Sequence, residues 1–420
     1  MSRLSLSIAI LVIVVSALSS NVAMAGGQNQ SALTSLRAAV QKDLDNLRNQ
    51  IGFPGATAAF LLPDGRIFEF ATGMADPARN ISMSRDSRIM SGSIGKTFVA
   101  ALALALVNEG KLDLDDKISR WLGDEPWFDR LSNGDAITLR MLLDHTSGIP
   151  DYVYSSRFAE ASTTLFADPD SHPGPLDLIR YSLDEPALFE PGTQYTYSDT
   201  DYLLAGLVLE KASGEDYYQA IIKRFLYPHQ LTRTAPSSGR YHPGLVQGHT
   251  AKDNLFNLPD GLSLDAGLWN VDPGFEWTGG GLVTNVRDLV RWASLLYSGR
   301  AMDGDYLDQL LARPPEGVKY VDYLLAPPRT EDEKINGRGY YGLAVSVSGE
   351  GENLNYGHCG WFPGYLSTFA YYPASGVAVA FQMNTDLGGL DKNIEGAGRT
   401  LEMARQTLIT TILSSSITTR

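Results

Sequence analysis

The spacing of hydrophobic residues changes twice along this chain, and that change limits the fold more than any other feature. Apolar residues recur at helical spacing over residues 32–50, and alternation with period two marks short segments near both ends. The expected strands are residues 56–62, 66–72, 341–347, 365–372 and 377–383. Between them, residues 115–270 hold helical segments broken by Pro, Gly and Asp. The pattern predicts an α/β fold interrupted by an all-α insertion.

The two strand-rich ends are expected to form one domain. We assign residues 26–115 and 275–420 to this α/β domain, and residues 116–274 to a mainly helical domain. The longer helices of the α/β part are expected at 93–109, after Asn285, and at about 392–413.

Residues 1–25 have the pattern of a secretory signal peptide. Arg3 precedes an apolar run, and Ala23-Met24-Ala25 has the small residues of a cleavage site. A membrane anchor is the alternative, but this run is shorter than the ~20 residues of a span and contains serines. We expect the leader to be cleaved. The protein would then be exported, periplasmic or secreted, with no stable membrane anchor.

Composition excludes several classes of protein. The net charge is −14 and the pI is about 4.9, whereas nucleic-acid binders usually carry a basic surface, so no nucleic-acid partner is expected. The single cysteine, Cys359, excludes an intrachain disulfide and a Cys-rich zinc site.

Ser93 and Lys96 are the first candidates for chemistry. Residues three apart share one face of a helix, so the hydroxyl and the amine would meet at the start of the 93–109 helix. A neutral lysine can activate a serine nucleophile, and the free N–H groups of a helix N-terminus can hold an oxyanion. The tetrapeptide alone is a weak signal, because a capping Ser and a surface Lys give the same pattern.

Gly92-Ser93-Ile94-Gly95-Lys96-Thr97 also resembles the end of a phosphate-binding loop. That motif needs a glycine where this chain has Met90, so nucleotide binding is a remote alternative.

Two later segments supply further candidates. Tyr197, followed by Asp199, stands in a loop before a helix, and a Tyr hydroxyl beside a lysine can carry protons. His358 and Gly360 precede an expected strand, and the next amide, from Trp361, can donate to an oxyanion. Each segment on its own more often has a structural role. The order of the three motifs along the chain is specific only when they are taken together.

These three motifs resemble those of the serine β-lactamase and D-alanyl-D-alanine peptidase superfamily, in the branch with class C β-lactamases, D-aminopeptidases and esterases. Further stretches match at 142–150, 191–206 and 278–282, so the resemblance covers roughly residues 35–385. It implies a mostly antiparallel sheet flanked by helices, with an inserted all-α domain. It also implies acyl transfer without a cofactor on a small-molecule or peptide substrate, such as a cell-wall peptide, a β-lactam or an ester.

The resemblance assigns roles to individual residues. Ser93 would be the nucleophile, Lys96 its proton acceptor and Tyr197 the general acid or base. His358 and Gly360 would line the site, and the amides of Ser93 and Trp361 would form the oxyanion hole. His145 with Asp144 or Asp151 offers an alternative triad, but no G-x-S-x-G motif surrounds a serine.

Two positions depart from the family pattern. Asp199 replaces the usual Asn; a carboxylate near Lys96 favours its ammonium form, which shifts more of the base role to Tyr197. Cys359 replaces a hydroxyl residue that contacts substrate carboxylates. We therefore expect an amidase or peptidase like D-alanyl-D-alanine carboxypeptidase rather than an efficient β-lactamase. A carboxylesterase, a D-aminopeptidase and a slowly acylating penicillin-binding sensor are the alternatives.

Overall fold

The computed structural model describes residues 30–251, 254, 256–258, 261–315, 318–320, 339–386 and 394–415. The leader predicted at 1–25 lies outside these ranges and stays a prediction. Within them, no helix combines the length and the apolar character that a membrane crossing requires.

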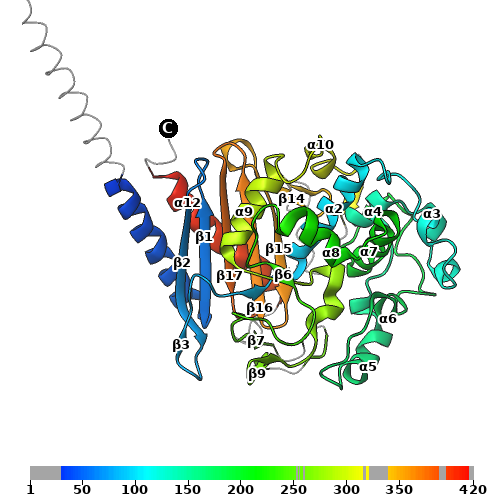
Figure 1. The fold of residues 1–420 in the computed structure, drawn as a ribbon, viewed down its shortest axis with the longest axis horizontal. Coiled ribbons are helices and arrows are strands. Elements are labelled where there is room, and N and C mark those ends of the chain that lie inside the picture. Colours follow the sequence, from blue (N-terminus) through cyan, green and yellow to red (C-terminus); the bar gives the residue numbers. More distant parts are fainter. Residues whose placement is uncertain are drawn as a thin grey trace, which may run out of the picture.

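An eight-stranded antiparallel sheet forms the centre of the molecule, in the order β13-β14-β15-β16-β17-β1-β2-β3 (Figure 1). Its strands are β1 Gly55–Leu61, β2 Ile67–Asp76, β3 Ile81–Ser82, β13 Tyr340–Tyr341, β14 Ser346–Ser348, β15 Asn355–Phe362, β16 Tyr365–Tyr372 and β17 Val377–Met383. Strands from both ends of the chain meet where β1 pairs with β17, with Ala56 opposite Met383. The antiparallel sheet flanked by helices confirms the predicted fold class.

The remaining strands are short. They are β4 Ile89–Met90, β5 Gln194–Tyr195, β6 Ala235–Pro236, β7 His249–Thr250, β8 Gly261–Leu262, β9 Leu264–Asp265, β10 Leu268–Trp269, β11 Leu282–Thr284 and β12 Lys319–Tyr320. The helices are residues 30–51, α2 Lys96–Asn108, α3 Ser119–Leu122, α4 Leu139–Leu143, α5 Ser156–Leu165, α6 Pro175–Ile179, α7 Asp199–Ser213, α8 Tyr217–Ile221, α9 Val286–Tyr297, α10 Leu307–Leu310 and α12 Ile394–Leu413.

Helices cover both faces of the sheet. The helix 30–51 and α12 pack together on one face, on the side away from the helical part of the molecule (Figure 1). Helix α9 packs against β1, β16 and β17 on the other face. Successive residues of a strand point to opposite faces of the sheet, so β17 contributes to the core on each side. Val379 and Phe381 pack in the core under the helix 30–51 and α12, whereas Ala378 and Ala380 pack in the core on the α9 side. Both faces of β17 are therefore buried.

Two strand predictions were wrong. Residues 341–347 are not one strand, because Gly342 N–H donates to Val345 O and Ala344 has φ +53°, so a tight turn separates β13 from β14. His358 and Gly360 lie inside β15 rather than before a strand. The predicted strands 365–372 and 377–383 are confirmed, and so are the helix after Asn285 and the final helix. The domain boundaries stay a prediction.

We expect Phe381→Ala to lower the free energy of unfolding by about 3–5 kcal/mol. Phe381 is fully buried in the central strand and its ring meets Phe53 edge-on at 5.9 Å, so truncation leaves a cavity. Chemical denaturation measures the change. The exposed Glu352→Ala is the control, expected within about 0.5 kcal/mol of the wild type. A loss below about 1 kcal/mol for Phe381→Ala would contradict the assigned core.

Candidate active site

Ser93 stands on a short turn that leads directly into α2. The turn, Gly92–Gly95, is a 3-10 helix, and Lys96 begins the α-helix behind it. Gly92 has φ +52°, a conformation that glycine adopts without strain. A side chain at Gly360 would meet Ser91 O at 1.9 Å, so the turn and β15 touch backbone to backbone. This contact places Ser93 beside the strand that carries His358, Gly360 and Trp361.

Lys96 is completely buried, and its amine donates three hydrogen bonds. The acceptors are Ser93 Oγ at 3.1 Å, Asp199 Oδ1 at 2.5 Å and Gly279 O at 2.5 Å. An ammonium has three protons, so this geometry satisfies all of them. Asp199, the residue that departs from the family pattern, is thus the ion-pair partner of this amine.

Tyr197 lies over Lys96, with the amine 5.0 Å from the centre of its ring. Its hydroxyl oxygen is shielded from solvent and has no hydrogen-bond partner among the described residues. Burial raises the pKa of this hydroxyl well above its usual value, and Asp199 adds to the effect, although Ser93 offsets part of it. The resting phenol is thus protonated, which favours a role as proton donor over the larger base role expected from the sequence.

Two further carboxyl groups, Asp151 and Glu276, line the same cleft. The sequence analysis named Asp151 only as a partner of His145 in the alternative triad, and it missed Glu276. Burial, with a smaller contribution from the nearby Asp199 carboxylate, raises the pKa of each to about 8. Asp151 Oδ2 accepts the N–H of Asp199 at 3.0 Å, at the start of α7. Their signals were weak: Asp151 follows the matching stretch 142–150, and Glu276 precedes the Gly-rich stretch 278–282.

His358 lines the cleft but is not a cationic group. Its Nδ1 donates to Cys359 O at 2.6 Å, so Nε2 is left to accept from the Tyr341 hydroxyl at 2.7 Å. Burial, opposed in part by the hydrogen bond to Cys359 O and assisted by the charge of Lys96, lowers the pKa of His358 to about 4. The imidazole is neutral at pH 7 and both nitrogens are engaged.

The cleft has a volume of about 320 Å³. Ser93, Tyr197, Asp199, His358, Gly360 and Trp361 all line it, so the structure brings these predicted residues together, with Lys96 beneath them. The exposed thiol of Cys359 also faces this cleft and lies 3.4 Å from Thr368 Oγ1. In the described part of the chain, no three His, Cys, Asp or Glu side chains are grouped so that they could hold a metal ion.

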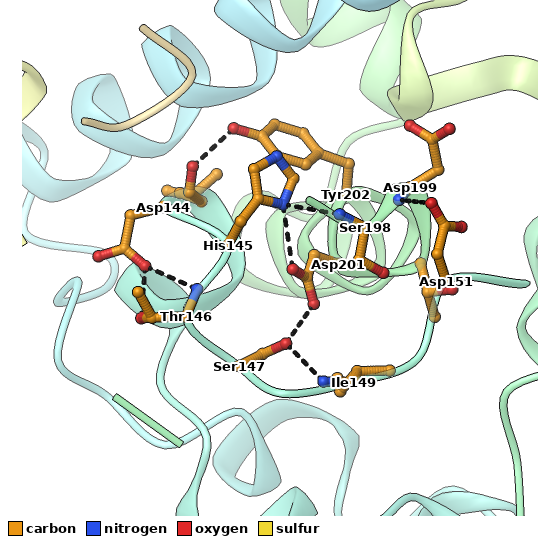
Figure 2. A network of polar contacts seen from close by, with 12 residues as sticks. Asp144, His145, Thr146, Ser147, Ile149, Asp151, Ser198, Asp199, Asp201 and Tyr202 are labelled. Atoms are coloured by element: carbon orange, nitrogen blue, oxygen red, sulfur yellow. Dashed lines mark hydrogen bonds and ion pairs between the residues drawn. The ribbon is translucent and has the colours of Figure 1, made fainter. Parts of the chain in front are cut away.

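His145 does not form the alternative triad with Asp144 or Asp151. Its Nδ1 faces Asp201 Oδ2 at 3.1 Å, and Ser147 Oγ donates to Asp201 Oδ1 at 2.6 Å (Figure 2). The serine of this buried chain contacts the carboxyl group rather than the imidazole, which is the wrong order for a catalytic triad. Asp144 instead accepts from the Thr146 hydroxyl and N–H.

This buried network holds the segment that carries Tyr197. Thr196 N–H donates to His145 O at 3.0 Å. Ser198 N–H donates to His145 Nδ1 at 3.3 Å (Figure 2). The rings of His145 and Tyr197 are 4.2 Å apart between centres. The residues on both sides of Tyr197 are thus bound to His145, which sets the direction of the phenol.

The comparisons with known proteins agree with this geometry. Residues 36–399 match the family model described as Beta-lactamase. The chain belongs to this family. It therefore lies within the β-lactamase-like serine hydrolase superfamily, which confirms the resemblance found in the sequence.

Curated relatives include two penicillin-binding proteins. Penicillin-binding protein 4 of Amycolatopsis lactamdurans is 25% identical over 82% of this chain and 84% of its own length. A penicillin-binding protein of Bacillus subtilis (strain 168) is 25% identical over 73% of this chain, and the match spans only 62% of that protein.

Among solved structures, D-amino acid amidase from Ochrobactrum anthropi SV3 has a TM-score of 0.71 at 22% identity, over 90% of this chain and 99% of that chain. A D-stereospecific amidohydrolase from Streptomyces sp. has a TM-score of 0.67 at 24% identity, over 84% and 97%. At these identities the likeness shows a shared fold.

We expect Ser147→Ala to lower the free energy of unfolding by about 1–3 kcal/mol, since Asp201 Oδ1 and Ile149 N–H lose their buried partner. Thermal or chemical denaturation measures this loss. Ser155→Ala is the matched control, since its hydroxyl makes no cap hydrogen bond to α5. Equal stability of the two variants would show that the network contributes nothing.

Proposed function

We propose that the protein is a serine amidohydrolase that cleaves amide bonds next to a free amino group, in amino-acid amides or short peptides. The supporting observation is that the side chains around the candidate nucleophile are acidic and not basic. The nucleophile candidate Ser93 lies among three carboxyl groups, Asp151, Asp199 and Glu276, and the described lining residues include neither Arg nor Lys.

A substrate carboxylate finds no partner in this cleft. Carboxypeptidases and β-lactamases act on molecules with such a group, and binding it calls for a free cation or strong donors. Lys96 is occupied by its three acceptors and His358 is neutral, with a pKa of about 4. Cys359 supplies only a weak donor. The charge therefore favours an amine-bearing substrate over the carboxypeptidase-like reaction expected from the sequence.

The proposed reaction runs through an acyl-enzyme. Lys96 passes one proton to Asp199 Oδ1 and takes the Ser93 proton on the freed amine, while Ser93 Oγ attacks the carbonyl carbon. The amides of Ser93 and Trp361 hold the oxyanion. Tyr197 protonates the leaving nitrogen as the C–N bond breaks and regains a proton from Lys96. Water then attacks the acyl carbon by the same proton route and releases the acid.

We expect Ser93→Ala to lower kcat/KM for phenylalanine amide by about 10³-fold or more, because the acyl-enzyme cannot form. The wild type is tested on both enantiomers of this amide, on 3-phenylpropanamide, which lacks the amine, and on benzylpenicillin. Intact mass spectrometry after rapid quenching shows whether an adduct forms on the wild type alone.

We expect the amine-bearing amide to be preferred over 3-phenylpropanamide by about tenfold or more, since the described lining of the cleft includes acidic side chains but neither Arg nor Lys. Turnover that survives Ser93→Ala would refute the acyl-enzyme. A preference for benzylpenicillin would refute the amine-bearing substrate and favour the penicillin-recognising alternatives.

We expect Asp199→Asn to move the acidic limb of the pH dependence of kcat/KM toward higher pH. Without the carboxylate, Lys96 must lose its proton to solvent before Ser93 reacts, instead of passing it to Asp199. The exposed Asp124→Asn makes the same change of net charge and should leave the profile unmoved. If the acidic limb of the kcat/KM profile does not move in Asp199→Asn, this proton route is refuted.

A further inference from the structure

Glu276, like Asp151, is a carboxyl group of the cleft that the proposed reaction does not use. It lies in the segment 273–279 just before Trp277, whose φ of 38° and ψ of −114° are strained for a non-glycine residue. It is 7% exposed, and it lines the cleft together with Ser93 and Asp199. Its Oε2 has no hydrogen-bond partner among the described residues. A buried, unpartnered carboxyl oxygen beside a nucleophile calls for a ligand.

Among the residues that the structure describes, no Lys or Arg forms an ion pair with Glu276. Lys96 is the nearby cation, but its three protons go to Ser93, Asp199 and Gly279. Asp151, the other buried carboxyl group, differs from Glu276. Its Oδ2 accepts Asp199 N–H and its Oδ1 accepts Val153 N–H, so its oxygens are already bound within the loop. Glu276 thus has free binding capacity that Asp151 lacks.

Glu276 and Asp199 lie close together beside two glycines. A Cβ added to Gly279 would be in ordinary contact with both acids, 3.7 Å from Asp199 Oδ1 and from Glu276 Cγ. A Cβ on Gly280 would meet Glu276 Oε1 at 2.7 Å, so a side chain there would displace this carboxyl group. Both acids line the cleft, and the Asp199 side chain is 24% exposed.

Burial raises the pKa of Glu276 to about 8, with Lys96 lowering it and Asp199 raising it. The other titratable groups that face it are Tyr152 and Tyr218, whose own pKa values are raised by burial, and Asp151 acts through Asp199. Below about pH 8, Glu276 is therefore a neutral acid, and a nearby cation would favour its ionised form.

We propose that Glu276 and Asp199 form a subsite for the ammonium group of the substrate, and that Glu276 gives up its proton when this group binds. The proposal rests on the proposed function, whose amine-bearing substrate it places. The balance is simple: a neutral Glu276 carboxyl and a substrate ammonium become a carboxylate–ammonium pair, and one proton leaves to solvent. Substrate binding is thus coupled to the release of a proton.

The test measures protons rather than turnover. Phenylalanine amide is titrated into Ser93→Ala by calorimetry at about pH 6.5, in buffers of different ionisation enthalpy, where both the probe amine and Glu276 are protonated. We expect about one proton released per ligand bound. In Ser93→Ala combined with Glu276→Gln we expect almost none. No release from Ser93→Ala, or the same release after Glu276→Gln, would overturn the proposal.

A second measurement needs no change at Glu276. Infrared difference spectra of Ser93→Ala with and without the amide should show a protonated carboxylic acid band lost and a carboxylate band gained. An unchanged carboxyl region would overturn the proposal. This result is independent of the acyl-enzyme: turnover that survives Ser93→Ala would remove the proposed nucleophile and leave the proton release standing.

Selectivity supplies a matched control. We expect Glu276→Gln, in the active enzyme, to lower the ratio of kcat/KM for phenylalanine amide to that for 3-phenylpropanamide by about tenfold or more. The exposed Glu160→Gln removes the same charge on α5 and should keep the wild-type ratio. An unchanged ratio in Glu276→Gln would argue against the subsite.

Discussion

The buried ammonium of Lys96 is the interaction on which the rest of the site depends. A charge without access to water is tolerated only where enough acceptors surround it, and removing one of them leaves a large penalty. The three acceptors come from the turn that carries Ser93, from the start of α7 and from the Gly-rich segment before β11. These parts of the chain must therefore assemble together, and the nucleophile, the Tyr197 loop and the glycine floor are fixed relative to one another.

A second group of buried polar residues, around His145, supports the Lys96 site. His145 has φ +60° and is fully buried, which places its ring between Asp201 and the aromatic rings of Tyr197, Tyr202 and Tyr341. Burial lowers the pKa of His145 well below its usual value and raises that of Asp201 well above it. Both groups are thus neutral in this pocket, and their function is to orient the Tyr197 segment rather than to carry charge.

The sequence predicted features that depend on neighbouring residues. The Ser93–Lys96 spacing, the cap at Asn285 and the alternation in β16 and β17 follow from local geometry. The break between β13 and β14 was missed because the alternation of apolar residues continues through the turn at Ala344. Glu276 was missed for a different reason: its burial and its distance from Asp199 are set by contacts between segments far apart in sequence, which no local pattern records.

The pairing of β1 with β17 has a consequence for how the chain folds during its synthesis. The sheet joins strands from opposite ends of the chain, so the N-terminal hairpin has no neighbour on its β17 side until the C-terminal strands are available. A growing chain on the ribosome would carry apolar strands with an open edge throughout synthesis, a state prone to aggregation. The order of the strands therefore makes completion of the sheet slow and late in folding. Keeping the chain unfolded until its synthesis is complete would protect it from aggregation.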